Sequence, residues 1–161
     1  MISADDLLFS FRSIADTAVK LASDVPDERF AEQPVEGINH PAWLFGHLSI
    51  YNGVIVSLLK GEPFDNPWDE PCGKNSQPEP DRSAYGSKEE ILAGFQSGVD
   101  AAEQAIKSAA EEAWSAPVNH PEWGKQFSCV AAAVVYLTTT HLALHTGQLS
   151  GWRRTAKLPR I

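Results

Sequence analysis

Four long stretches of this chain place their apolar residues at intervals of three and four positions. That spacing is the pattern of amphipathic α-helices. The stretches cover residues 3–24, 41–60, 87–114 and 128–156 of the 161-residue chain. No stretch of useful length alternates apolar and polar residues as a half-buried strand does. The sequence therefore predicts an all-α protein, and its length suits a single domain over residues 1–161.

Two of the predicted helices begin with a capping box. In this motif a serine and an acidic residue three positions later each accept, with the side chain, a hydrogen bond from the other's backbone N–H group. Ser3 pairs with Asp6 in this way, and Ser87 pairs with Glu90. The second predicted helix opens at a proline, so Asn39 or His40 is expected to be its N-cap. For His40 an exposed position is the alternative, and His120 is also expected to be exposed, in a polar loop.

The connection between the second and third predicted helices, residues 61–86, is too long for a hairpin turn. It is long enough to travel the length of a bundle, so these two helices would run parallel. The prediction is therefore a four-helix bundle of up-down-down-up type. Phe64 and Trp68 are expected to hold the connection against the bundle surface; alternatively the connection covers the site as a lid.

Three histidines form the candidate metal site. His141 and His145 are four positions apart in the fourth predicted helix, so both side chains lie on one helix face. Two ligands hold a metal poorly, and His47, on the apolar face of the second helix, is the best third ligand. Three neutral imidazoles with an open coordination position are typical of a catalytic metal site. The alternative is that all three are hydrogen-bonded core residues.

The net charge of −8 argues against nucleic acid as a partner, because nucleic-acid binders present a basic face. The N-terminal residues lack the basic segment of a secretory signal, and no apolar run is long enough for a membrane span. Two cysteines, Cys72 and Cys129, are too few for a disulfide framework. We therefore expect a cytoplasmic protein with no membrane partner.

The sequence resembles the DinB-like superfamily, also called DinB/YfiT-like, of bacterial four-helix proteins. The resemblance is carried by residues 43–48 (WLFGHL) and 141–149 (HLALHTGQL), and the helix order fits over essentially the whole chain. The residues that end the chain are also similar to the family's: Arg153, Arg154, Leu158 and Pro159. The resemblance implies a divalent metal ion, zinc or nickel, with His47, His141 and His145 as its ligands.

Similar proteins of known activity are bacillithiol S-transferases and a mycothiol-dependent maleylpyruvate isomerase. The resemblance thus implies a metal-dependent thiol S-transferase with a low-molecular-weight thiol as cosubstrate and a small-molecule substrate. A metal-dependent hydrolase, a non-catalytic metal-binding stress-response module and a purely structural bundle stay open as alternatives. Gln148 and Tyr51 lie one turn beyond His145 and His47, where each would orient a ligand or serve only the structure. Many relatives are homodimers, and a homodimer is expected here.

Overall fold

The computed structural model describes residues 3–64 and 71–161, and within these residues it contains helices, turns and loops but no strand. The prediction of an all-α protein is confirmed for this part of the chain. The three long single helices are α1 (Ala4–Ala22), α2 (Pro41–Lys60) and α3 (Lys88–Ser108). A fourth helical rod joins three consecutive segments: α6 (Val130–Val135), the π-helical η4 (Tyr136–His141) and α7 (Leu142–Thr155). Trp68, expected to hold the long connection to the surface, lies outside the described residues.

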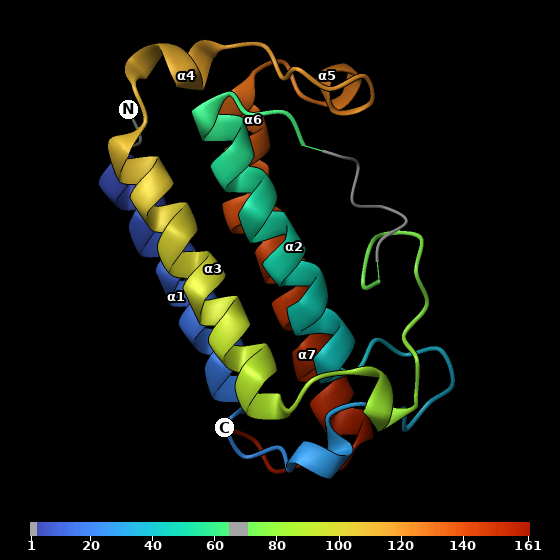
Figure 1. Cartoon of the computed structure of the whole chain (residues 1–161). Helices are drawn as coiled ribbons and strands as arrows, with labels where there is room; N and C mark the ends of the chain where they lie inside the picture. Colours follow the sequence, from blue (N-terminus) through green and yellow to red (C-terminus); the bar gives the residue numbers. More distant parts are fainter. Residues whose placement is uncertain (1–2, 65–70) are drawn as a thin grey trace.

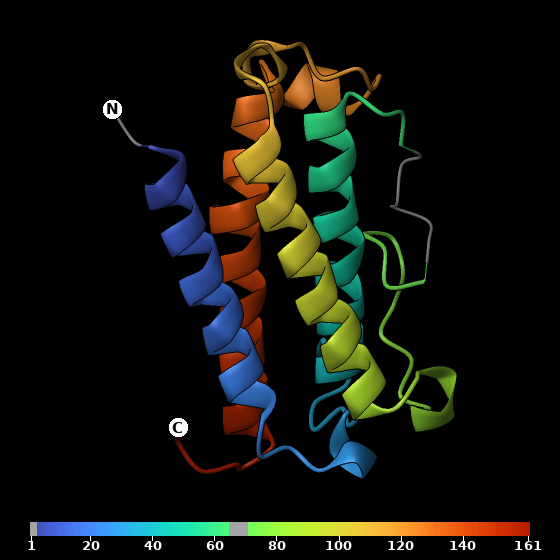
Figure 2. The same ribbon diagram turned by 60° about the vertical axis from the view of Figure 1, so that its left-hand side comes forward.

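Within residues 3–64 and 71–161, four short helices lie between or beside the rods: η1 (Asp27–Arg29), η3 (Arg82–Ala84), α4 (Glu111–Ser115) and α5 (Trp123–Gln126). The four rods lie side by side (Figures 1 and 2), with α1 and the fourth rod running towards the end that holds the C-terminus. The helices α2 and α3 run the opposite way, parallel to each other, and pack together along their length. α2 also contacts α6, η4 and α7, which brings His47 to the fourth rod.

Helix ends follow the predicted capping chemistry. Ser3 with Asp6 and Ser87 with Glu90 both form complete capping boxes. His40 is the N-cap of α2: its Nδ1 accepts a hydrogen bond from the Trp43 N–H at 3.2 Å. The His40 side chain is fully buried rather than exposed, and its Nε2 donates to the Glu79 carbonyl at 2.9 Å. The second helix is therefore fixed at its start by a buried cap.

The core helix of the bundle is α2. By length and composition alone, it is long and apolar enough to cross a membrane, but 67% of its most apolar window is buried inside the molecule. Its buried side chains lie against those of α3 and the fourth rod, as expected for the central helix of a bundle. Burial within the bundle therefore accounts for its apolar composition.

One predicted helix boundary is wrong, and a second differs by two residues. The third helix was expected to reach residue 114, yet α3 ends at Ser108 because Ala109 is extended, with φ −65° and ψ 131°. Here the chain turns into α4, which crosses the end of the bundle (Figure 1) and packs Trp114 against the core. No glycine or proline marks this break, so tertiary packing overrides the helical pattern. The fourth helix begins at Val130 rather than residue 128, because Cys129 is extended.

Candidate metal centre

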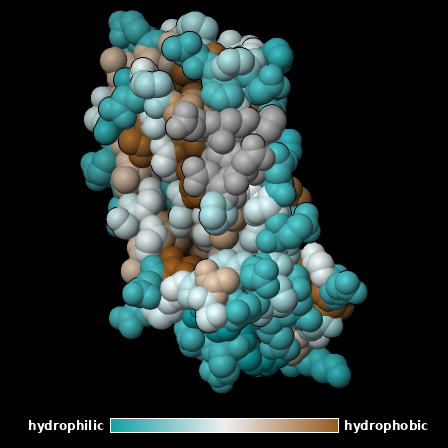
Figure 3. Space-filling view, turned by 45° about the vertical axis from the view of Figure 1, so that its right-hand side comes forward, coloured by the Kyte–Doolittle hydropathy of each residue, from teal (hydrophilic) through white to brown (hydrophobic). Residues whose placement is uncertain are grey.

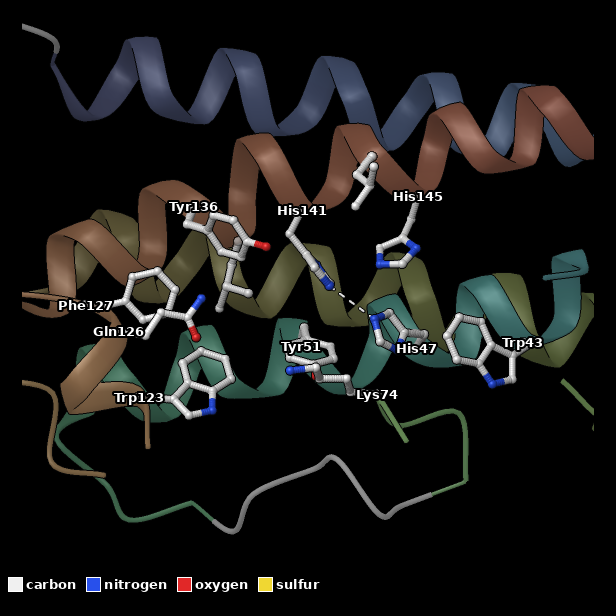
Figure 4. A pocket seen from close by; sticks show the side chains of 12 residues that line it. Trp43, His47, Tyr51, Lys74, Trp123, Gln126, Phe127, Tyr136, His141 and His145 are labelled. Atoms are coloured by element: carbon white, nitrogen blue, oxygen red, sulfur yellow. Dashed lines mark hydrogen bonds between the residues drawn. The ribbon is translucent and has the colours of Figure 1, made fainter. Parts of the chain in front are cut away.

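The structure brings His47, His141 and His145 together inside the bundle. All three side chains are buried, and their ligand nitrogens lie within 4.8 Å of one another. The Nε2 atoms of His47 and His141 are 3.1 Å apart. A tetrahedral zinc ion bonded to two imidazoles at about 2.0–2.1 Å holds their nitrogens about 3.3 Å apart. The three rings point towards one another from α2 and the fourth rod (Figure 4), and they could hold a metal ion.

Hydrogen bonds fix which nitrogen of two of these histidines faces the centre. The Nδ1 atom of His47 donates to the Cys72 carbonyl oxygen at 2.6 Å, and a carbonyl oxygen can only accept. The Nδ1 atom of His145 donates in the same way to Gln148 Oε1 at 2.9 Å, which also accepts from Asn39 Nδ2 at 3.1 Å. Both histidines therefore present a bare Nε2 lone pair to the shared space. An outer partner that fixes the ring in this way is usual for metal-ligating histidines.

The hydrogen bonding of His141 bears on whether the cluster can hold a metal ion. Its Nδ1 atom is buried without a hydrogen-bond partner among the described residues, and its Nε2 atom faces the bare nitrogen of His47. In the metal-free protein a proton on His141 Nε2 can be donated to the bare nitrogen of His47, and a cation that replaces this proton would bind both nitrogens. A divalent cation would satisfy all three Nε2 atoms at once, so the donor set fits a metal ion.

The fourth rod widens just before the pair of histidines. The π-helical η4 ends at His141, and π-helical turns occur frequently at functional sites. The hydroxyl of the buried Thr138 donates to the Val134 carbonyl at 2.8 Å, and that of Thr139 donates to the Val135 carbonyl at 2.5 Å. Such side-chain bonds to the preceding turn compete with the helical ladder and bend helices. The run of threonines thus sets the register in which His141 enters the centre.

Burial keeps the three imidazoles neutral. Burial lowers the pKa of His47 to about 4, with a further decrease from the neighbouring His145. Burial and the two other histidines lower the pKa of His141 to about 3. The pKa of His145 is also lowered by burial, an effect that its bond to Gln148 opposes. Neutral imidazoles are the form that binds a metal, so the cluster is ready to ligate at physiological pH.

Comparison with known proteins gives the family. The sequence model of the DinB superfamily matches residues 11–149, which include all three histidines. The chain belongs to the DinB superfamily. No curated protein and no solved structure matches it significantly. The superfamily assignment and the histidine cluster both fit metal binding.

In this DinB-superfamily protein the three histidines line a pocket of about 260 Å³. Beyond the histidines, the pocket is lined mainly by aromatic and aliphatic side chains, including Tyr51, Trp123, Phe127, Tyr136, Leu137 and Leu144. Lys74 and Gln126 also line it, and both are exposed residues. Apolar residues show in the recesses of the face that carries the long connection, and polar residues surround them (Figure 3).

The structure shows what two neighbours contact, Gln148 and Tyr51, whose roles the sequence left open. Gln148 orients His145 through the hydrogen bond to Nδ1. Tyr51 packs its ring against His47 and His141, with centroid separations of 4.7 and 4.6 Å. Burial raises the pKa of Tyr51 to about 12, so its hydroxyl stays protonated at neutral pH and cannot be a general base.

Several residues of the candidate site have no sequence signal. The Cys72 carbonyl is a backbone group, and only the path of the connection brings it to His47. Trp123 and Phe127 come from a loop segment that was expected only to connect helices. His120, expected to be exposed, is half-buried and stacks on Phe64 at 5.0 Å. The one sequence signal that this segment packs on the bundle is its aromatic content, because Trp123 and Phe127 lie close together in it.

Proposed function

We propose that this protein is a metal-dependent enzyme that transfers a low-molecular-weight thiol to a small electrophilic substrate. A zinc or nickel ion would be held by His47, His141 and His145. The supporting observation is the convergence of three neutral, buried imidazoles in the lining of an otherwise mainly apolar pocket. When bound there, a divalent ion supplies a Lewis acid that keeps a thiol in its nucleophilic thiolate form. Three neutral ligands leave the ion its full charge, which favours an anionic fourth ligand.

The residues around the pocket favour thiol transfer over hydrolysis. None of the described residues that line it is Asp or Glu, so none offers a carboxylate base to activate water. Tyr51 is held protonated by burial. These features suit a nucleophile that needs only to be held as an anion, whereas a metal-dependent hydrolase usually adds a general base.

The thiol must come from outside the chain. Burial raises the pKa of the Cys72 thiol, which keeps it protonated. Its Sγ lies against Gly46, where a Cβ added to that glycine would be 2.8 Å away. Cys129, the N-cap of α6, does not line the pocket. Neither cysteine is therefore placed to act as the nucleophile on a substrate at the histidines.

Three further features belong to the same proposal. The up-down-down-up order of the bundle is proposed as the arrangement that lets α2 and the fourth rod share the centre. We also propose a cytoplasmic location and no nucleic-acid or membrane partner, and the net charge of −8 argues against nucleic acid. A homodimer is proposed because Trp114 lines a second, apolar groove of about 810 Å³ together with Leu7 and Val135.

The test is a spectroscopic titration of the cobalt-substituted protein with glutathione, coenzyme A, bacillithiol and mycothiol. The proposal expects a thiolate-to-cobalt charge-transfer band with at least one thiol. It also expects transfer to a model electrophile that is lost in His145→Ala. If no thiol perturbs the cobalt spectrum but ester or amide hydrolysis occurs, the hydrolase alternative replaces the proposal. If neither is seen, the protein is a non-catalytic metal-binding module.

A further inference from the structure

Six aromatic rings that line the pocket form a closed series of ring contacts, here called the aromatic belt. They come from α2, from η4 and from the segment at α5: His47, Tyr51, Trp123, Phe127, Tyr136 and His141. In that order, neighbouring ring centroids are 4.7, 6.0, 5.7, 5.4 and 6.0 Å apart, and the last ring returns to the first at 5.1 Å. Figure 4 shows these rings arranged around one common space. Two members of the belt are candidate metal ligands, so the ion would lie at its edge.

Some residues that line the pocket are buried, and others are exposed at its opening. Trp123 is only 3% exposed, and Tyr51 is 6% exposed. At the mouth, Leu144 is 56% exposed, and Gln126 and Lys74 are also exposed.

The shape and chemistry of this belt define a ligand. Aromatic rings pack best on other flat apolar rings, in offset-stacked or edge-to-face arrangements. The pocket volume of about 260 Å³ is just below the range found for drug-sized ligands. It therefore suits a ligand with a single ring rather than a larger molecule. Because the ion would lie at the edge of the belt, the donor atom must be close to that ring.

We propose that the pocket selects a small, flat, apolar molecule of single-ring size, whose anionic donor atom reaches the metal while its ring lies inside the aromatic belt. This names the class of thiol that the proposed enzyme would take, and it rests on the proposed function for the metal contact. The belt itself can be tested without the metal.

The experiment compares three thiols on the cobalt-substituted protein. Phenylmethanethiol has a flat ring, cyclohexylmethanethiol has a puckered ring of similar size, and 2-mercaptoethanol has none. We expect phenylmethanethiol to bind about tenfold more tightly than either of the others, since only its flat aromatic ring can stack on the rings of the belt. Equal affinity of the three thiols would overturn the proposal.

The matched variants are Phe127→Leu and Phe9→Leu. The first removes one ring of the belt and leaves an apolar side chain, whereas Phe9 is 78% exposed and lies outside the pocket. We expect Phe127→Leu to lose most of the preference for phenylmethanethiol and Phe9→Leu to keep it. The proposal fails if both variants behave as the unmodified protein does.

A second readout separates this inference from the proposed thiol chemistry. If no thiol perturbs the cobalt spectrum, the thiol-transfer proposal has failed. Binding of 4-fluorobenzyl alcohol to the metal-free protein, followed by fluorine NMR, then tests the belt alone. Binding that is weakened by Phe127→Leu supports the belt as a site for a flat ring, and no detectable binding overturns it.

Discussion

The Nδ1–H of His47 donates a hydrogen bond to the backbone carbonyl of Cys72 at 2.6 Å, which joins a candidate metal ligand to the long connection. Cys72 has a left-handed backbone with φ of 66°, which sets the direction of the chain at this point. Two more donors of α2 bind the same segment: Trp43 Nε1 donates to Ser76 Oγ at 2.9 Å, and His40 Nε2 donates to the Glu79 carbonyl. The long connection is thus part of the candidate centre.

Gly46→Ala tests this relationship. The added Cβ would lie 2.8 Å from the Cys72 Sγ and 3.2 Å from its Cβ, so the connection would have to shift and weaken the bond to His47. We expect the metal dissociation constant to rise by about 10–100-fold, as measured with a competing chelator. The matched control is Gly53→Ala in the same helix, where an added Cβ meets nothing within 4 Å.

Gly53→Ala should leave metal affinity unchanged and raise the free energy of unfolding by about 0.5–1 kcal/mol, because glycine is a poor helix former. Unchanged metal affinity in Gly46→Ala would mean that the contact with Cys72 does not support the centre.

Gln148→Leu tests the second outer partner. The variant removes the acceptor of the His145 Nδ1 bond, so the ring loses its fixed orientation. We expect the metal dissociation constant to rise by about 10–100-fold. Gln148→Glu, which keeps an acceptor oxygen, should recover most of the affinity. A Gln148→Leu variant that binds metal as tightly as the unmodified protein would contradict the assigned role.

How much the sequence predicts depends on whether the signal is local. Helix starts at Ser3, His40 and Ser87 were predicted because capping uses neighbouring residues. The pairing of His141 with His145 follows from helical spacing, and the placing of His47 follows from the apolar face it shares. The break of α3 after Ser108 was missed because it depends on packing at the end of the bundle.

The aromatic belt and the Cys72 carbonyl could not be predicted for the same reason. Phe127 and Tyr136 are nine positions apart and meet at 5.4 Å because η4 and the end of α5 fold against each other. Cys72 meets His47 because a long connection returns along α2. Neither contact has a periodic pattern. Long-range contacts made by loops leave no regular sequence signal.

Acidification should destabilise the metal-free protein. The pKa of His47 is lowered from 6.5 to about 4, so the unfolded state binds a proton between these values and the folded state does not. The free energy of unfolding therefore decreases as the pH falls from about 6.5 to about 4, by about 3 kcal/mol for this histidine. His141, with a pKa of about 3, contributes in the same direction.

Urea unfolding of the metal-free protein between pH 7 and pH 4 measures this effect, and His141→Ala should show a shallower pH dependence. The same slope in both proteins would contradict the burial of these imidazoles. In the metal-loaded protein, ordinary imidazole pKa values place release near pH 6, and the lowered values of His47 and His141 move the expected release below that pH.

The apolar groove lined by α1, α4 and α6 predicts the oligomeric state. Val135 is 45% exposed in this groove, and a second copy of the chain would cover it. We expect light scattering at micromolar concentration to give the mass of a dimer, and Val135→Asp to give that of a monomer because it buries a charge in the contact. A monomer mass for the unmodified protein would contradict the dimer.

The central claim is that His47, His141 and His145 hold one divalent ion. The most direct measurement is the metal content of protein purified without added metal and then loaded with zinc or nickel. We predict about one ion per chain in the unmodified protein and in His120→Ala, whose histidine lies outside the cluster. We predict almost none in His141→Ala. Full occupancy in His141→Ala would contradict the claim.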